Sequence, residues 1–245
     1  MDLIRRRHDG TGMWLIHSHE FQDWQNGSCQ TLFCPGIPGA GKTLIASIVI
    51  NHLLNTFRNK NIGIAYVFCN YQSQGKQTPL AMFSSLLEQM LIQRDSIPDN
   101  LQRLYDHHIG RRTRPTFDDV FNLLRSEIRT FDQTFVVVDA LDEYNNDNDT
   151  QKYMVHRMLE LQELSKMNLL VTSRFAHHIE SYFQQAAQVE IRADGEDVRR
   201  YIRGNMHLLA TTPSENLEEA IVGGITQVVD GMYRRPAKAK SEDTN

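Results

Sequence analysis

The sequence predicts an α/β fold with one parallel β-sheet and helices on both faces. Short apolar segments alternate with longer amphipathic segments between residues 31 and 190, which is the pattern of strands and crossover helices. The segment 62–69 and the residues 135–138 before Asp139 are continuously apolar, as in strands buried on both faces. A glycine-rich turn follows the first apolar segment. Ligands bind at the carboxyl ends of strands in such sheets, so we expect the functional residues there.

The expected elements follow this alternation along the chain. An N-terminal helix is expected because Trp14, Phe21 and Trp24 share one helical face, which would pack on the core. Strands are expected at about 31–34, 62–69, 134–139, 168–174 and 188–191. Helices are expected at about 44–57, 78–94, 98–112, 117–130 and 150–166, then one ending near 186, and further helices after 194.

The glycine-rich turn carries a phosphate-binding motif. The segment TLFCPGIPGAGKT (31–43) matches the pattern G-x-x-x-x-G-K-T. Glycines let successive main-chain N–H groups point at an anion, and the helix that follows presents its positive amino end. Lys42 is expected to reach the β- and γ-phosphates, and the Thr43 hydroxyl to ligate Mg²⁺. The nucleotide-binding residues predicted from the motif are Gly36, Ile37, Pro38, Gly39, Ala40, Gly41, Lys42 and Thr43.

Acidic residues follow the strand expected at 134–139. Asp139 ends that strand, where its carboxylate is expected to hold Mg²⁺ directly or through water. Hydrolysis also needs a group that orients or deprotonates water. Many related ATPases have a glutamate directly after the metal aspartate, but this chain has Ala140. Asp142 and Glu143 are therefore the two candidates for this catalytic role, with Glu143 favoured for reach.

A basic residue ends the next strand. Arg174 closes the segment 168–174, where a guanidinium can contact the γ-phosphate and distinguish a triphosphate from a diphosphate. We expect Arg174 to act as this sensor. The N-K-x-D element of guanine-specific switch GTPases is absent, so ATP is the expected nucleotide, with GTP not excluded.

Composition limits the partners and the compartment. The net charge of −4 gives no electrostatic case for nucleic acid or an anionic membrane, so neither is expected as a partner. The basic loop 110–116 lacks interleaved aromatic residues and is expected to be solvated. The chain shows no signal peptide and no apolar segment of membrane-spanning length. Three cysteines without a C-x-x-C pair suit a reducing compartment, so we expect a cytoplasmic protein.

The motifs together resemble a known family. GTGMWLIHSHEFQDW, CPGIPGAGKTLIASIVINHL, YVFCNY, VVVDALDEY and LLVTSRF occur in the order seen in fungal NACHT-type proteins of the STAND class. These are nephrocystin-like NTPase modules, often found upstream of ankyrin or WD repeats, and the similarity covers about 5–232. The resemblance implies a three-layer P-loop NTPase with strand order 5-1-4-3-2. It also implies that 36–43 form Walker A, that Asp139, Asp142 and Glu143 form Walker B, and that Arg174 is sensor 1.

The resemblance further implies a nucleotide-dependent signalling switch. Its winged helix and repeats have no counterpart here, so we expect a module truncated before them. The expected divisions are a lead with an amphipathic helix (1–30), the NTPase core (31–192), a helical extension (193–233) and a disordered tail (234–245). The expected partners are a nucleoside triphosphate, a second copy of the chain, or full-length relatives.

Three functional hypotheses remain open at this point. The first is an ATP- and Mg²⁺-dependent switch whose hydrolysis is slow or absent. The second is a non-catalytic nucleotide-binding interaction module that regulates full-length relatives. The third, which we favour least, is a small-molecule kinase, because no segment supplies a recognisable acceptor pocket or catalytic base.

Overall fold

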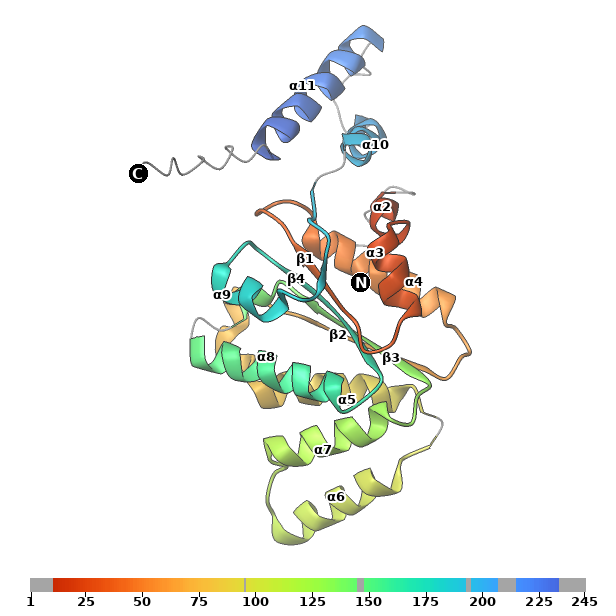
Figure 1. The fold of residues 1–245 in the computed structure, drawn as a ribbon, viewed down its shortest axis with the longest axis vertical. Coiled ribbons are helices and arrows are strands. Elements are labelled where there is room, and N and C mark those ends of the chain that lie inside the picture. Colours follow the sequence, from red (N-terminus) through yellow and green to blue (C-terminus); the bar gives the residue numbers. More distant parts are fainter. Residues whose placement is uncertain (1–10, 95, 145–147, 193–194, 207–214, 234–245) are drawn as a thin grey trace, which may run out of the picture.

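The computed structural model describes residues 11–94, 96–144, 148–192, 195–206 and 215–233. The predicted lead before residue 11 and the predicted tail 234–245 lie outside these residues. The described chain has a central sheet with helices on both faces, which is the predicted three-layer α/β fold (Figure 1).

The sheet is parallel, with strand order β2-β3-β4-β1-β5. This confirms the predicted order, and it places the strand before Arg174 between the phosphate-loop strand and the Asp139 strand. In register, Pro35 lies beside Ser173, and Phe68 lies beside Asp139. The strands are β1 (Thr31–Pro35), β2 (Ile62–Phe68), β3 (Gln133–Asp139), β4 (Met167–Ser173) and β5 (Ala187–Gln188).

One face of the sheet is covered by α2 (Met13–Ile16), α3 (His19–Asn26) and α4 (Lys42–Thr56). The single N-terminal helix expected from the aromatic spacing is in fact two helices. The Ser18 hydroxyl donates to the Leu15 carbonyl at 2.7 Å and accepts from the Phe21 N–H at 3.3 Å, so it ends one helix and caps the next. The side chain of Trp24 is fully buried, as expected, and its indole N–H bonds to the Leu169 carbonyl at 3.1 Å.

The other face is covered by α5 (Pro79–Ile92), α7 (Phe117–Ile128) and α8 (Asn148–Glu163). Figure 1 shows α6 (Asp99–Arg111) outside α7, farther from the sheet. Residues of β3 alternate between the two cores: Val136 and Val138 pack with this layer, and Phe135 and Val137 pack with the α4 layer. A strand covered on both faces has apolar side chains on both sides, which explains the apolar run 135–138 in the sequence.

The edge strand β2 is closed by glutamine side chains. Gln89 accepts from the Tyr66 N–H at 3.0 Å and donates to the Tyr66 carbonyl at 2.8 Å. Gln93, the C-cap of α5, does the same for Ile64 at 3.1 and 2.8 Å. The main-chain groups at these two positions are therefore satisfied without a neighbouring strand.

The segment after β4 differs from the prediction. The helix expected to reach residue 186 is a short α9 (His177–Glu180) followed by a 3-10 turn, η3 (Ser181–Phe183). The Ser181 hydroxyl bonds to the His178 carbonyl, and the chain then turns so that β5 pairs with β1. The predicted strand 188–191 lies partly outside β5, although the Ile191 N–H still bonds to the Pro35 carbonyl at 2.7 Å.

Two helices extend beyond the sheet layers, α10 (Gly195–Asn205) and α11 (Glu215–Tyr233). They contact each other and lie on the side of the sheet away from α5, α7 and α8 (Figure 1). One hydrogen bond joins α10 to the N-terminal segment, from the Gly12 N–H to Asp197 Oδ2 at 2.7 Å. In the part of the chain that is described, no helix is long and apolar enough to cross a membrane.

Candidate nucleotide-binding site

The phosphate loop, Gly36–Thr43, leaves the carboxyl end of β1 and enters α4. At its start, the Gly36 N–H donates to the Ser173 carbonyl at 3.0 Å, which fixes the loop to β4. A Cβ on Gly36 would lie 2.5 Å from the carbonyl oxygen of Ile191. Real Cβ atoms do not approach an oxygen that closely, so main-chain packing requires glycine at this position.

The later glycines of the loop are required for a different reason. Gly39 and Gly41 have φ values of 79° and 87°, in the left-handed region. A Cβ on either residue would meet no heavy atom within 4 Å. Gly41 is the N-cap of α4, so the positive amino end of this helix opens onto the loop. The open space in front of these glycines fits an anionic phosphate group.

Lys42 extends across the loop. Its ammonium donates to the carbonyl oxygens of Gly36 at 2.9 Å and Ile37 at 3.0 Å. Burial lowers the pKa of Lys42, and the nearby carboxylate of Asp142 acts in the opposite direction. The charge of Arg174 also lowers the pKa of Lys42, and the carboxylate of Asp139 raises it.

Asp139 lies across from Thr43. Its side chain is 2% exposed, and its Oδ1 accepts a hydrogen bond from the Thr172 hydroxyl at 2.6 Å. Burial raises the pKa of Asp139, while hydrogen bonds from Thr172 and Thr43 act to lower it. The hydroxyl of Thr43 and the carboxylate of Asp139 are hard oxygen donors of the kind that Mg²⁺ prefers.

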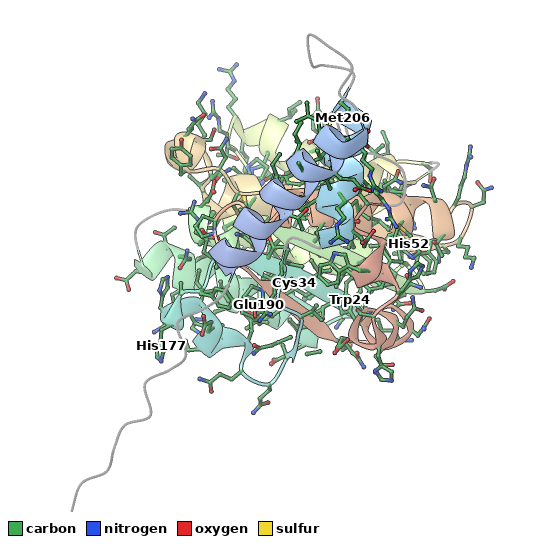
Figure 2. All side chains as sticks on the ribbon, turned by 90° about the horizontal axis from the view of Figure 1, so that it is seen from above. Trp24, Cys34, His52, His177, Glu190 and Met206 are labelled. Atoms are coloured by element: carbon green, nitrogen blue, oxygen red, sulfur yellow. The ribbon has the colours of Figure 1, made fainter. Side chains whose placement is uncertain are left out.

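No cluster of three or more His, Cys, Asp or Glu side chains suited to a metal was found among the described residues. Figure 2 shows His52 and His177 far apart on the molecule, so these two histidines do not form a metal site. Thr43 and Asp139 could hold a metal ion at this rim together with phosphate oxygens, which is the usual arrangement for Mg²⁺.

The candidate catalytic acids lie on a sharp turn after β3. Ala140 has φ 53°, an uncommon left-handed value for a residue with a Cβ, and the turn η2 (Leu141–Glu143) follows. Arg174 binds both acids: its Nε lies 3.0 Å from Asp142 Oδ2, and its terminal nitrogen lies 3.2 Å from Glu143 Oε1. The Arg174 main-chain N–H also donates to Asp142 Oδ1 at 2.8 Å.

The structure brings all of the sequence-predicted site residues to one rim. The phosphate loop follows β1, Asp139 ends β3, and Arg174 follows β4, which lies between them. Sequence reasoning did not anticipate the pairing of Arg174 with both acids. It also missed Thr172, whose hydroxyl bonds to Asp139; the signal was a threonine directly after the apolar run 169–171.

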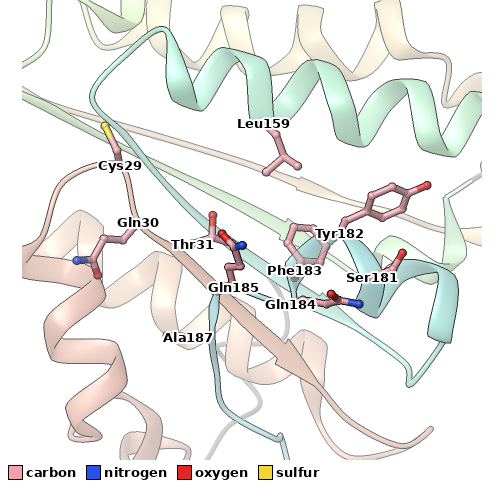
Figure 3. A pocket seen from close by; sticks show the side chains of 11 residues that line it. Cys29, Gln30, Thr31, Leu159, Ser181, Tyr182, Phe183, Gln184, Gln185 and Ala187 are labelled. Carbon is pink, nitrogen blue, oxygen red and sulfur yellow. The ribbon is translucent and has the colours of Figure 1, made fainter.

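A separate pocket lies at the opposite rim. Figure 3 shows side chains from the start of β1, from α8 and from η3 around a cavity of about 540 Å³. Its lining includes Thr31, Leu159 and Tyr182, and it contains none of the sequence-predicted site residues. Cys29, which is exposed, also lines this pocket. Cys34 in β1 is buried instead, and burial raises the pKa of its thiol.

Comparison with family models gives a match that includes all the residues of this site. Residues 10–174 match the model described as nephrocystin 3, N-terminal. The chain belongs to this family. The match contains the phosphate loop, Asp139, both acids of the turn and Arg174, so the whole rim lies within the part that defines the nephrocystin 3 N-terminal family. A search of curated proteins finds no match.

Solved structures support the fold assignment of this family member. A Walker-type ATPase of Pyrococcus abyssi is 13% identical with a TM-score of 0.56, over 83% of this chain and 60% of the other. The Orc1 protein of Aeropyrum pernix in complex with DNA is 11% identical with a TM-score of 0.52, over 89% of this chain and 59% of the other. The chain thus spans less than two thirds of either structure. At these identities the similarity shows the P-loop NTPase fold alone.

One expectation about partners is corrected by these similarities. The net charge was taken to exclude nucleic acid, but the Orc1 structure contains DNA and has this fold. A P-loop NTPase fold is therefore compatible with a nucleic-acid partner, and the overall charge of −4 does not exclude one. Overall charge is a poor guide because a local basic surface can bind phosphates on an acidic protein.

Proposed function

We propose that this chain is a nucleotide-binding module that binds ATP together with Mg²⁺. The observation that carries the proposal is the meeting of Thr43 and Asp139 beside the open phosphate loop. Hydroxyl and carboxylate oxygens for a metal, main-chain N–H groups for phosphates and a lysine are the parts that P-loop NTPases use for nucleotides. The residues proposed to hold the phosphates are Gly36–Thr43.

Each residue has a distinct proposed role. Lys42, which now donates to two loop carbonyls, turns to the β- and γ-phosphates when nucleotide is bound. Thr43 and Asp139 hold the metal ion, which neutralises charge on the phosphates when bound. Arg174 exchanges its two carboxylate partners for the γ-phosphate and so distinguishes the triphosphate from the diphosphate.

The geometry favours slow or absent hydrolysis. Asp142 and Glu143, the two candidate bases, both bind Arg174, and Ala140 occupies the position next to Asp139. Carboxylate oxygens that bind Arg174 are not placed to orient or deprotonate a water molecule. We also propose that the chain acts in the cytoplasm as a switch of the NACHT and STAND type. Its two nucleotide states differ in the arrangement of the acidic turn.

The same pairing favours a second candidate, a module that binds nucleotide and does not turn it over. The two candidates share the binding site and differ only in whether Arg174 releases an acid. Measurable turnover by the purified protein would rule out the second candidate.

The experiment is to identify and quantify the nucleotide released from purified protein, and then to measure turnover with added ATP, GTP and Mg²⁺. We expect an adenine nucleotide at close to one per chain and turnover far below the usual range for metabolic enzymes, about 1–1,000 s⁻¹. Rapid phosphate transfer to a metabolite would support a kinase instead. Protein that carries no nucleotide and ignores both ATP and GTP would contradict the proposal.

A further inference from the structure

The end of β4 contacts every part of the rim. Ser173 accepts the Gly36 N–H through its carbonyl, and Arg174 binds Asp142 and Glu143. The preceding residue, Thr172, makes two hydrogen bonds of its own and is fully buried. Arg174 was assigned a role from the sequence, whereas Thr172 was assigned none.

The direction of both Thr172 hydrogen bonds is fixed by their partners. The Ala140 N–H can only donate, so Thr172 Oγ1 accepts it, at 2.9 Å. The hydroxyl proton is then directed to Asp139 Oδ1, at 2.6 Å, which is the short distance typical of a hydroxyl bound to a carboxylate. One hydroxyl group therefore links the Asp139 side chain to the peptide that begins the acidic turn.

This arrangement constrains two features of the site. The hydrogen bond to Oδ1 orients the Asp139 carboxylate, and Oδ2 takes no part in this hydrogen bond. The bond from Ala140 stabilises a residue in the left-handed region, which costs free energy without such support. The Glu143 N–H then donates to the Ala140 carbonyl at 2.8 Å, so the position of the acids depends on the conformation of the same residue, Ala140.

We propose that Thr172 is the positioning residue of the metal site: its hydroxyl fixes the Asp139 carboxylate toward Thr43 and ties it to the acidic turn. This inference rests on the proposed nucleotide-binding function. Groups that orient metal ligands through hydrogen bonds typically change metal affinity by about 10- to 100-fold when they are removed.

Thr134 provides a matched control. It is also a fully buried threonine, and it lies at the opposite end of the neighbouring strand β3. Its hydroxyl has no hydrogen-bond partner among the described residues. Thr134→Val thus removes a buried threonine hydroxyl without breaking a hydrogen bond, whereas Thr172→Val breaks two.

The experiment compares nucleotide affinity in Mg²⁺ with affinity in EDTA for the wild type, Thr172→Val, Thr172→Ser and Thr134→Val. The ratio of the affinity in Mg²⁺ to the affinity in EDTA is the Mg²⁺-dependent gain. We expect this gain to fall by about 10- to 100-fold in Thr172→Val, with the affinity in EDTA unchanged. Thr172→Ser retains the hydroxyl and should keep the gain, as should Thr134→Val. Loss of the gain in Thr172→Ser, or full retention in Thr172→Val, would overturn the proposal.

A second readout does not need nucleotide. Amide hydrogen exchange at Ala140 should accelerate in Thr172→Val, because its N–H loses its acceptor, and should be unchanged in Thr172→Ser and Thr134→Val. Unchanged exchange at Ala140 in Thr172→Val would contradict the positioning role even if no variant bound nucleotide. If the wild type fails to bind nucleotide but amide exchange at Ala140 still responds as expected, the proposed function is refuted. The linkage through Thr172 then remains supported.

Discussion

The phosphate loop and the acidic turn lie at the same rim of the sheet but are held by different kinds of contact. The loop is positioned by main-chain packing: Gly36 bonds to Ser173 and has no room for a Cβ beside Ile191. The turn is positioned by side chains, because Arg174 binds both of its acids. Main-chain packing is retained when a ligand binds, whereas side-chain ion pairs can exchange partners.

The energies support this distinction. The side chain of Arg174 is 48% exposed, and ion pairs at such positions contribute about 0–1 kcal/mol because water screens them. Fitting an extra carbon into a packed site costs about 1–3 kcal/mol. We therefore regard the loop as a preformed cradle and the turn as the part that responds to the γ-phosphate.

The largest expected effect is that of Lys42→Ala. Removing the ammonium deletes charge-assisted bonds worth about 2–3 kcal/mol, which corresponds to about hundredfold weaker binding of ATP. Equilibrium titration with a labelled ATP analogue measures this. Lys152→Ala, at an exposed position on α8, is the control and should bind as the wild type does. Equal binding by Lys42→Ala and the control would show that the loop is not the binding site.

Gly36→Ala tests whether the loop is held by main-chain packing. Because the added Cβ would lie 2.5 Å from the Ile191 oxygen, the loop or residue 191 must move. We expect a loss of about 1–3 kcal/mol, seen as a lower Tm and about 10- to 100-fold weaker nucleotide binding. Gly110→Ala on α6, where a Cβ meets nothing within 4 Å, should not weaken binding. Wild-type behaviour of Gly36→Ala would contradict main-chain control of the loop.

Asp139→Asn should raise the stability of the fold and weaken the binding of nucleotide with Mg²⁺. Burial raises the pKa of Asp139, so the folded chain holds more protons than the unfolded chain between the ordinary and the raised pKa values. Stability contributed by this group therefore falls as pH rises through that window. At neutral pH the neutral asparagine should raise Tm while abolishing the Mg²⁺-dependent gain in affinity. Thermal unfolding at several pH values checks the sign; a lower Tm at neutral pH would show that the ionised carboxylate stabilises the fold.

The smallest expected effect on stability is that of Arg174→Ala. Losing half-exposed ion pairs should change the free energy of unfolding by about 0–1 kcal/mol. Binding of ATP relative to ADP should nevertheless weaken by about tenfold, as expected for one charged contact to the γ-phosphate. Parallel titrations with ATP and ADP measure this ratio. An unchanged ratio would mean that Arg174 only anchors the acidic turn.

The same contrast explains what the sequence could and could not predict. The loop and the parallel sheet were predictable, because Gly36, Gly41 and Lys42 form a local motif and the strands are largely apolar on both faces, whereas the strand order followed from the family resemblance. The Arg174 pairing joins residues more than 30 positions apart and depends on the left-handed turn at Ala140, which no sequence pattern marks. The helix expected to end near 186 was wrong because pairing of β5 with β1 overrides its local pattern.

One measurement tests the central claim most directly. Wild-type protein freed of nucleotide is titrated with a labelled ATP analogue, once with Mg²⁺ and once with EDTA. We expect saturable binding at one site per chain, tighter with Mg²⁺ and displaced by unlabelled ATP. No binding in either condition, or binding indifferent to Mg²⁺, would contradict a site in which the phosphate loop and Asp139 act together.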